Sequence, residues 1–337
     1  MRAIVINGKE DLELVEVPTP EPVPGQVRLR MAYAGICGSD LHYYYDGANG
    51  AFVVREPLVP GHEVSGTVDL DPSGELAPGT PVTVHPATFG QVRPGVEDRP
   101  HLWPGGAYLG SASTWPHTQG GMSEYLLVDR AMVRVLPASL PLRRAALAEP
   151  LAVGMHGLGL AGGVEGRRVL VTGAGPIGLL TAAAALAAGA AEVTATDVLP
   201  GPLERARALG VHATVDVSRE ELPAEAYDVV LECSGVPASI NAAFRAVRRA
   251  GVHVQLGMVP DEPKGLNLAP VISKEVTVHG SFRFKDEIDA AVALLDAQPG
   301  IEQVVTHELP ADQAVEAFAV ARDSAASGKV LVTLWQD

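Results

Sequence analysis

Residues 168–178 read RVLVTGAGPIG, and this stretch decides the fold. Its apolar first half is typical of a buried strand, and its second half is a GxGxxG motif that opens an Ala-rich helix. Gly173 permits a tight turn, Gly175 lets the backbone approach a pyrophosphate, and Gly178 lets the helix pack closely on the strand. Because the first N–H groups of a helix attract phosphate, the stretch predicts a dinucleotide site.

Asp197 follows Gly178 by 19 residues and comes at the end of the next predicted strand. A carboxylate at that point accepts a hydrogen bond from a ribose 2′-hydroxyl and repels a 2′-phosphate. The first basic residue after it is Arg205, a turn or more into the following helix. We therefore expect NAD rather than NADP. The expected contacts are Gly173, Gly175, Pro176, Ile177, Gly178 and Asp197.

Strands and helices alternate around this motif, from residue 148 to residue 285. Such alternation predicts an α/β protein with a parallel sheet covered by helices on both faces, the doubly wound Rossmann architecture. The predicted strands are 168–172, 192–196, 213–216, 228–232, 251–256 and 275–280, and the predicted helices are 177–188, 203–209 and 238–247.

Short apolar runs interrupted by Pro and Gly fill residues 1–147 and predict a β-rich domain. Residues 91–116 are rich in Gly and Pro and predict a long loop. We expect residues 286–337 to complete this first domain, with helices at 286–295 and 311–321 and a strand at 329–334. The other predicted strands are 3–6, 12–17, 27–33, 64–70, 81–85, 123–128 and 132–136.

The composition excludes several classes of function. The chain has 337 residues and a net charge of −15, which argues against binding to nucleic acid or to an anionic membrane. Two cysteines cannot form a disulfide framework or a zinc module of three or four thiolates. The uncharged stretch 169–191 is broken by Gly and Pro, so we predict no membrane span there. The sequence begins without a signal-peptide pattern, and we expect a cytoplasmic protein.

Three short motifs bring together a thiolate, imidazoles and carboxylates: Cys37-Gly-Ser-Asp-Leu-His42, Gly61-His-Glu63 and Ala148-Glu-Pro150. Three protein ligands and one open position are the pattern of a catalytic zinc site. Each motif alone has an ordinary structural explanation, since a single cysteine in a turn is more often buried and inert. Their combination beside a dinucleotide site favours a catalytic metal centre.

The chain resembles the zinc-dependent medium-chain alcohol and polyol dehydrogenases, which combine a GroES-like catalytic domain with a Rossmann domain. The resemblance rests on these three motifs, on Gly120-Gly-Met-Ser-Glu-Tyr125 and on Gly173–Gly178, which span most of the chain. Within the family, the chain is most similar to the sorbitol and L-idonate 5-dehydrogenase branches. Residues 37–44 with 49–52, 109–121 and 280–284 resemble the idonate branch in particular.

The resemblance implies one catalytic zinc and a set of residues that would bind it. Glu63 would be both a ligand and a catalytic residue, because it would exchange with Glu149 or with water. Asp40 would orient the ligand histidine, as metal-bound imidazoles generally require. The implied metal ligands are Cys37, His62, Glu63 and Glu149.

The resemblance also implies a proton relay and further contacts to the cofactor. Ser39 and His42 would carry the alcohol proton through the cofactor ribose to solvent, and a histidine titrates near neutral pH. Cys233 is expected to pack as a small apolar residue. The further cofactor contacts would be Ser234, Gly257, Met258 and Arg283.

One departure from the family pattern is clear. Many relatives carry four closely spaced cysteines for a structural zinc, whereas residues 86–117 of this chain contain none. We therefore expect no structural zinc. Packing through Trp103, Tyr108 and Trp115 is expected to hold this lobe instead.

The implied reaction is oxidation of a secondary hydroxyl of a sugar acid, of the L-idonate to 5-ketogluconate type, with hydride transfer to NAD. A sorbitol or xylitol dehydrogenase is the alternative within the class, and a non-catalytic NAD-binding protein on the same scaffold is the alternative from another class. We also expect a homo-oligomer, a tetramer. A substrate carboxylate needs cationic or donating partners, for which the candidates are Arg283, Arg55, His117 and Tyr43–Tyr45.

Overall fold

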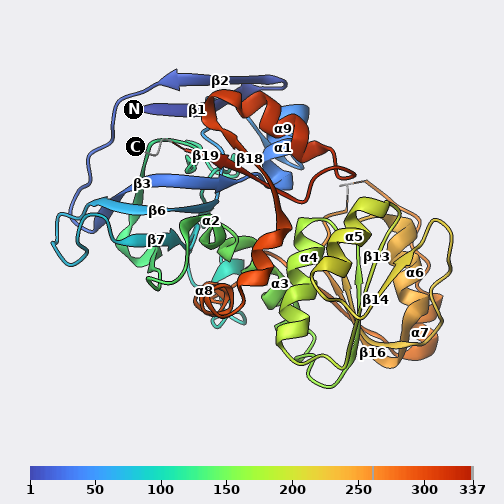
Figure 1. Ribbon diagram of the computed structural model, residues 1–337. Helices are drawn as coiled ribbons and strands as arrows, with labels where there is room; N and C mark the ends of the chain where they lie inside the picture. Colours follow the sequence, from blue (N-terminus) through green and yellow to red (C-terminus); the bar gives the residue numbers. More distant parts are fainter. Residues whose placement is uncertain (260–261, 335–337) are drawn as a thin grey trace. The chain divides into compact units, whose positions relative to one another are not determined.

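The computed structural model describes residues 1–259 and 262–334, and the chain forms two compact units (Figure 1). Unit 1 contains residues 1–149, 288–323 and 329–334, and unit 2 contains residues 150–287 and 324–328. The chain therefore leaves unit 1 before that unit is complete and returns to it later. None of the helices in the described residues is long and apolar enough to cross a membrane.

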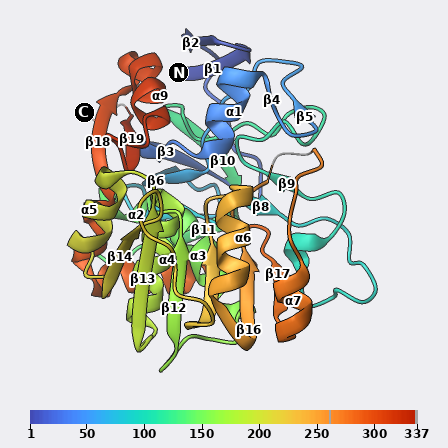
Figure 2. The same cartoon turned by 90° about the vertical axis from the view of Figure 1, so that its right-hand side faces the viewer.

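Unit 2 is built on a six-stranded parallel sheet with the strand order β14-β13-β12-β15-β16-β17 (Figure 2). Helices α4 and α5 lie on one face of the sheet, and α6 and α7 lie on the other (Figure 1). Covering on both faces explains why Val169–Val171 are entirely buried and apolar. The predicted doubly wound α/β architecture is confirmed. The bounds are β12 (Arg168–Thr172), α4 (Pro176–Ala187), β13 (Glu192–Asp197), α5 (Pro200–Ala208), β14 (Ala213–Asp216), β15 (Tyr227–Glu232), α6 (Pro237–Ala246), β16 (Val247–Gln255), α7 (Ala269–Lys274) and β17 (Thr277–Gly280).

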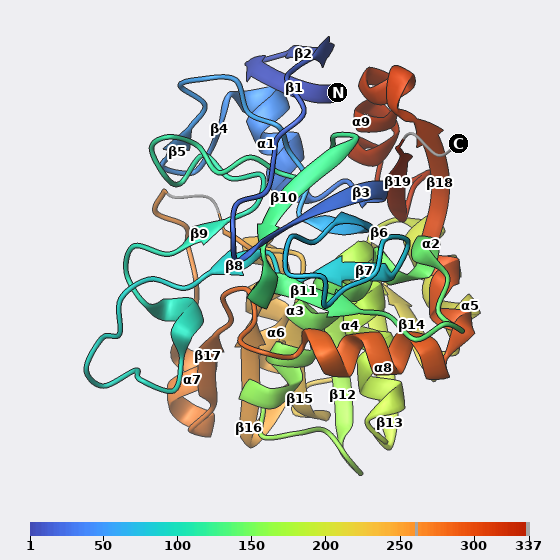
Figure 3. The ribbon, with the colours of Figure 1, turned by 90° about the vertical axis from the view of Figure 1, so that its left-hand side faces the viewer.

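Unit 1 contains a mainly antiparallel sheet of the order β11-β7-β6-β3-β19-β18, with β10 also paired to β3 (Figure 3). A separate hairpin joins β1 to β2, and short pairs join β4 to β5 and β8 to β9. The strands are β1 (Arg2–Gly8), β2 (Asp11–Glu16), β3 (Gln26–Gly35), β4 (Ala48–Asn49), β5 (Phe52–Val53), β6 (Glu63–Leu70), β7 (Pro81–Val84), β8 (Ala87–Thr88), β9 (Ala107–Tyr108), β10 (Tyr125–Asp129), β11 (Val133–Val135), β18 (Val305–Pro310) and β19 (Lys329–Thr333). The helices are α1 (Gly38–Asp46), α2 (Leu142–Ala145), α8 (Ile288–Ala297) and α9 (Ala314–Arg322), and α3 (Ala148–Leu160) begins at the end of this unit.

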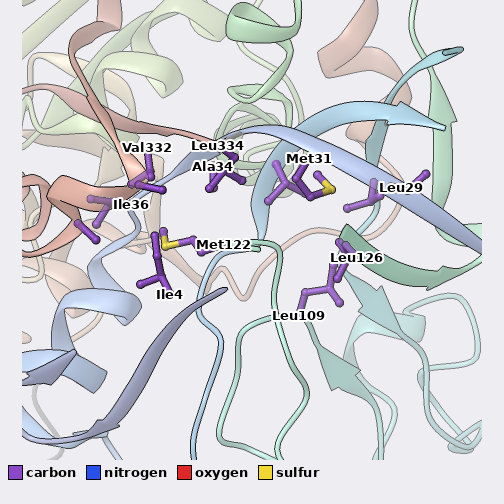
Figure 4. Close-up of a cluster of buried hydrophobic side chains, with 14 of the residues drawn as sticks. Ile4, Leu29, Met31, Ala34, Ile36, Leu109, Met122, Leu126, Val332 and Leu334 are labelled. Atoms are coloured by element: carbon purple, nitrogen blue, oxygen red, sulfur yellow. The ribbon is translucent and has the colours of Figure 1, made fainter. Parts of the chain in front are cut away.

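The core of unit 1 includes residues from both ends of its sequence. Ile4 and Met122 meet Ile36 and Val332 in one buried cluster (Figure 4). Val332 belongs to β19, which pairs with β3 in the register Leu331 to Gly35. The late strand β19 therefore both completes the sheet and closes the core that the first 149 residues begin.

The predicted elements differ from the observed ones at several points. Strand β18 and helices α1 and α7 were not among the predicted elements. The helix predicted at 238–247 ends at Ala246, because β16 already begins at Val247. In the predicted loop at 91–116, Trp103 and Tyr108 are held by hydrogen bonds, but Trp115 is 66% exposed. The expectation that Trp115 packs this lobe is therefore wrong.

Candidate metal and cofactor sites

Three potential metal ligands lie together in unit 1. Single donor atoms of Cys37, His62 and Glu63 all lie within 4.8 Å of one another. Cys37 is the residue before α1, and His62 and Glu63 stand at the start of β6. The backbone makes room for them, because a Cβ on Gly35 would lie 2.1 Å from Glu63 Oε2. Gly61 precedes His62 with φ at +96°, a conformation that suits glycine.

The environment of this cluster fits a cation. His62 is 6% exposed and Glu63 is entirely buried. His62 Nδ1 is a buried atom that makes no hydrogen bond within the described residues, whereas the buried Glu63 Oε2 lies beside the Lys329 ammonium. Buried polar atoms are normally satisfied, so an unpartnered imidazole nitrogen within a thiol, imidazole and carboxylate set fits a site that binds a metal ion.

Glu149 lies in the first turn of α3 and has a partner outside the cluster. The Tyr108 hydroxyl donates to Glu149 Oε1 at 2.5 Å, and the Tyr108 ring meets the His62 ring edge-on, with centroids 5.4 Å apart. Glu149 does not belong to the group of atoms within 4.8 Å of one another. Tyr108, which the sequence predicted only as a packing residue, thus links the lobe at 86–117 to the candidate metal site.

Asp40 connects the two loops that carry Cys37 and His62 through hydrogen bonds to both. Its Oδ2 accepts from Cys37 N at 2.9 Å, and its Oδ1 accepts from Gly61 N at 3.3 Å. The implied role was orientation of the His62 ring, but these hydrogen bonds run to backbone groups on either side of the cluster. Burial raises the pKa of Asp40, and the neighbouring His62 counteracts that effect.

Lys329 is a buried cation that the sequence analysis did not assign to the site. Its Nζ lies 2.6 Å from Glu63 Oε1 and 2.5 Å from Oε2, and it also donates to Ile36 O at 3.0 Å. The Lys329 side chain is 2% exposed and the Glu63 side chain is fully buried. The only sequence signal is a lysine that opens an apolar strand, because its partner is 266 positions away.

The charges of the site raise the pKa of His62. Burial lowers that pKa, but the negative charges of Cys37, Glu149 and Asp40 and a hydrogen bond to Cys37 outweigh burial and raise it to about 10. A metal-bound histidine is neutral, so a divalent cation would replace the proton that this cluster now favours.

The predicted relay residues share helix α1. Ser39 and His42 are three positions apart, which places them on one side of a helix. Ser39 is half-buried, and His42 is exposed with Nδ1 at 2.9 Å from Asp46 Oδ2. Ser39 and His42 therefore lie on one side of α1, the helix that begins directly after Cys37.

The glycine-rich turn of unit 2 has the geometry that its sequence predicts. Gly173 has φ at +84°, and a Cβ on Gly178 would lie 1.8 Å from Gly173 O. A Cβ on Gly175 would meet nothing within 4 Å, so that position faces open space. Asp197 Oδ2 accepts from Ala174 N at 2.9 Å and thereby fixes the turn to the end of β13. Pro176 and Ile177 are the first residues of α4.

The remaining predicted cofactor residues follow later strands of unit 2. Ser234 comes after β15, Gly257 and the 77% exposed Met258 come after β16, and Arg283 comes after β17. The Arg283 guanidinium lies 4.8 Å from the centre of the Phe282 ring. The unit thus gathers Ser234, Gly257 and Met258 at the carboxyl edge of the sheet.

Cys233 lies in the same region and has the character of an inert thiol. It is half-buried, and its Sγ lies 3.9 Å from Thr181 Oγ1. Burial and the nearby Glu232 carboxylate raise the pKa of the thiol well above its usual range. The thiol is therefore protonated at neutral pH.

Arg283 lies in unit 2, and the other residues considered for a substrate carboxylate are spread over unit 1. Tyr43 is buried with its hydroxyl near Ser111, and Tyr44 packs edge-on against Phe318. Tyr45 is half-buried beneath the guanidinium of Arg322. His117 is buried and accepts from the backbone N–H of the exposed Arg55. Tyr43 and Tyr44 therefore belong to the core rather than to a binding surface.

Two family models match the chain. The model described as "Alcohol dehydrogenase GroES-like domain" matches residues 23–138, and the model described as "Zinc-binding dehydrogenase" matches residues 176–297.

Individual relatives match almost the whole chain. The sorbitol dehydrogenase of Macaca fascicularis is 35% identical over 94% of this chain and 91% of its own length. The L-idonate 5-dehydrogenase (NAD(P)(+)) of Escherichia coli K12 is 33% identical over 98% of this chain and 97% of its own.

Solved structures are also similar to almost the whole chain. The crystal structure of L-idonate 5-dehydrogenase from Escherichia coli K12 superposes with a TM-score of 0.93 at 32% identity, over 98% of this chain and 97% of the other. The structure of 2R,3R-butanediol dehydrogenase from Bacillus subtilis superposes with a TM-score of 0.87 at 28% identity, over 98% and 99%.

Proposed function

Because the chain belongs to the zinc-dependent medium-chain alcohol and polyol dehydrogenase family, we propose that it oxidises a secondary hydroxyl of a sugar acid, of the L-idonate to 5-ketogluconate type, with hydride transfer to NAD. The observation that carries the proposal is the cluster of Cys37, His62 and Glu63 donor atoms within 4.8 Å. An alcohol is too weak an acid to lose its proton unaided at neutral pH, and a metal ion held by such a cluster would acidify a bound hydroxyl.

Cys37, His62 and Glu63 would hold one zinc ion, with Glu149 as the carboxylate that exchanges with Glu63. A zinc ion supplies acidity, since it lowers the pKa of an oxygen that binds to it by several units. Lys329 holds Glu63 in place, and Tyr108 holds Glu149. These two neighbours fix the carboxylates before metal or substrate arrives.

Ser39 would accept the proton that the alcohol loses and pass it toward His42. The hydroxyl of Ser39 can donate and accept at once, and His42 is exposed and can release the proton to water. Asp46 Oδ2 lies 2.9 Å from His42 Nδ1, and this contact would fix the orientation of the imidazole ring.

NAD is supported over NADP by the surroundings of Asp197. Its Oδ1 already accepts from the backbone N–H groups of Val198 and Leu199, at 2.8 and 3.0 Å, so the carboxylate is fixed at the end of β13. The Arg205 guanidinium donates to Ser324 O at 2.9 Å, within unit 2. A 2′-phosphate would therefore meet a fixed negative charge and a basic group that is already engaged.

A polyol such as sorbitol or xylitol is the second candidate substrate, and the similarity to sorbitol dehydrogenases favours it. The test is the rate of reduction of NAD and NADP by L-idonate, sorbitol, xylitol and L-threonine, with zinc content measured on the same preparation. We expect the highest rate with L-idonate and NAD, and loss of both zinc and turnover in Cys37→Ala. Much faster turnover of sorbitol would refute the sugar-acid assignment. Absence of zinc together with absence of turnover would favour a non-catalytic NAD-binding protein.

We also propose a homo-tetramer that uses the edge strand β17. This strand ends the sheet of unit 2, and Val278 on it and Ile272 on α7 are 46% and 76% exposed. Within the described residues β17 has a strand partner on one side only, and an open strand edge favours pairing with a second copy. Light scattering after size exclusion is expected to give four times the chain mass, and a monomer would contradict the proposal.

A further inference from the structure

Glu232 is a buried carboxylate at the carboxyl edge of the sheet in unit 2. It is the last residue of β15 and is fully buried. In the sheet it pairs with Thr172 of β12 on one side and with Gln255 of β16 on the other. The direction of winding reverses between β12 and β15, and open parallel sheets bind their ligands in the crevice at that point. Glu232 thus stands at the point where the proposed cofactor would cross the sheet.

The first carboxylate oxygen holds the loop after β15 and the end of β12. Glu232 Oε1 accepts from Thr172 Oγ1 at 3.1 Å and from Ser239 Oγ at 3.1 Å. The same oxygen accepts from Ser234 N at 3.2 Å and from the Ser234 hydroxyl. Thr172 directly precedes the glycine-rich turn, so this oxygen connects that turn to residues 233–235.

The second carboxylate oxygen holds the loop after β16. Glu232 Oε2 accepts from Gly235 N at 2.9 Å and from Gln255 Nε2 at 2.6 Å. The same Gln255 nitrogen donates to Gly257 O at 2.8 Å. All of these donors are neutral, and they come from the ends of β12 and β16, from the loop after β15 and from α6.

The three loops also touch each other directly. A Cβ on Gly173 would lie 2.9 Å from Ser234 Cβ, and a Cβ on Gly235 would lie 2.2 Å from Met258 O. A Cβ on Gly257 would lie 2.3 Å from Gly235 N. The loops after β12, β15 and β16 therefore form one closely packed platform, and Glu232 is the side chain to which all three are tied.

We propose that Glu232 is a positioning residue for the nicotinamide half of the cofactor. It fixes the backbone platform of residues 173, 233–235 and 257–258, and it does so without reaching the cofactor itself. The inference rests on the proposed NAD site. Asp197, which is expected to bind the adenosine ribose, ends β13 on the far side of β12. Loss of Glu232 is therefore expected to affect the nicotinamide half more than the adenosine half.

The test compares the binding of two ligands to Glu232→Gln. This variant keeps the shape of the side chain, but it replaces one carboxylate oxygen, which accepts hydrogen bonds, with an NH₂ group that cannot accept them from the surrounding N–H donors. NADH binding is measured by the change in its fluorescence, and ADP-ribose binding by competition against NADH. We expect the Kd of NADH to rise about tenfold or more and the Kd of ADP-ribose to rise less than about threefold. The control is Asp228→Asn, at the start of the same strand, where a carboxylate accepts from Arg168 N. We expect it to change neither Kd.

Further measurements separate positioning from simple stability. Gln255→Met removes the hydrogen bond to Gly257 O. We expect it to raise the Kd of NADH more than the Kd of ADP-ribose, by smaller factors than Glu232→Gln does. This variant keeps the test valid if Glu232→Gln does not fold. A Glu232→Gln protein that unfolds at lower temperature but binds NADH as tightly as the wild type would overturn the inference, as would equal weakening of both ligands. Wild-type protein that binds neither ligand would instead refute the proposed NAD site, and the inference with it.

Discussion

Two buried side chains of opposite charge, Lys329 and Glu63, determine the electrostatics of the candidate metal site. Burial lowers the pKa of Lys329, but Glu63, Cys37 and Glu149 raise it, and the net effect is a raised pKa. The ammonium is thus charged at neutral pH. Without it, the anionic groups would have only His62 to balance them.

Lys329→Met is expected to destabilise the metal-free protein by about 3–5 kcal/mol, because it leaves the fully buried Glu63 without its partner. Added zinc is expected to restore part of this loss, since Glu63 can then bind the ion. Thermal unfolding of unit 1, followed by fluorescence of its tryptophans with and without a chelator, measures both effects. Lys285→Met, which removes a 39% exposed ammonium, serves as the control and is expected to shift neither midpoint. Equal shifts with and without zinc would argue against this role.

A residue of the candidate site can be predicted from the sequence only if its neighbours along the chain indicate its role. The Cys37 motif and the His62-Glu63 pair were found because donor residues stand close together in the chain, and the structure brings them together. Lys329 and Tyr108 could not be found in the same way. Each acts through a partner far away in sequence, Glu63 and Glu149, and neither has a neighbouring residue that marks its role.

The turn between β12 and α4 allows two glycines to be compared at the scale of one element. Gly175→Ala adds a methyl group that meets no protein atom, whereas Gly178→Ala forces a Cβ to 1.8 Å from Gly173 O. We expect Gly175→Ala to keep its melting temperature within about 1 °C while NADH binding weakens at least tenfold, because the pyrophosphate approaches there. Gly178→Ala is expected to lose about 1–3 kcal/mol of stability as well. Calorimetry and NADH titration of both variants decide this, and unchanged NADH binding in Gly175→Ala would contradict the expected approach.

Helix α3 and residues 285–287 are joined by a hydrogen bond between His156 Nδ1 and Glu287 Oε1 at 2.7 Å, and this contact predicts an acid-sensitive stability. Burial raises the pKa of Glu287, but His156 and backbone N–H groups outweigh it and lower the pKa to about 2. Since the folded pKa is below the unfolded value of about 4.5, this stabilisation is complete above pH 4.5 and disappears as the pH falls toward 2. It amounts to about 3 kcal/mol at most, reduced by water at a side chain that is 23% exposed.

Glu287→Gln is therefore expected to be less stable than wild type at pH 7 and equally stable near pH 2. Urea unfolding of unit 2 at several pH values measures the difference. Asp286→Asn changes the neighbouring carboxylate, which is 73% exposed, and is expected to follow the wild-type curve throughout. If the free energies of unfolding of Glu287→Gln and wild type differed by the same amount at every pH, the lowered pKa of Glu287 would not contribute to stability.

Elements with strong periodic patterns were predicted, and the weakly patterned ones were not. Helices separate the six parallel strands of unit 2 except between β14 and β15, and all six strands were predicted. Strand β18 was missed because it is an edge strand with only Val305 and Leu309 buried, so it lacks an apolar run. Helix α1 was missed because its sequence mixes polar and aromatic side chains and has no apolar run.

At the scale of the whole molecule, unit 1 is discontinuous and unit 2 is nearly continuous. Unit 1 needs β18 and β19 from beyond residue 288, whereas unit 2 lacks only residues 324–328 when it is cut out as 150–287. The confirmed two-part fold follows from the family motifs, but the pairing of β19 with β3 joins residues about 300 positions apart, which no local pattern encodes.

We expect a fragment of residues 150–287 to fold and to bind NADH, with a loss of about 1 kcal/mol from the hydrogen bond between Arg205 and Ser324 O. A fragment of residues 1–149 is expected to aggregate, because β3 loses its partner strand β19 and the core loses Val332. Circular dichroism, light scattering and NADH titration of the two fragments check these outcomes. A soluble, cooperatively unfolding 1–149 fragment would show that β19 is dispensable.

The separation of Glu63 from Lys329 also sets an order of events during translation. The proposed metal ligands Cys37, His62 and Glu63 leave the ribosome early, and Lys329 follows 266 residues after Glu63. At about 5–20 residues per second, this gap is about 13–53 s long. During that interval the nascent chain carries the donors of the site without their ammonium, and a free zinc ion is the cation able to neutralise them first.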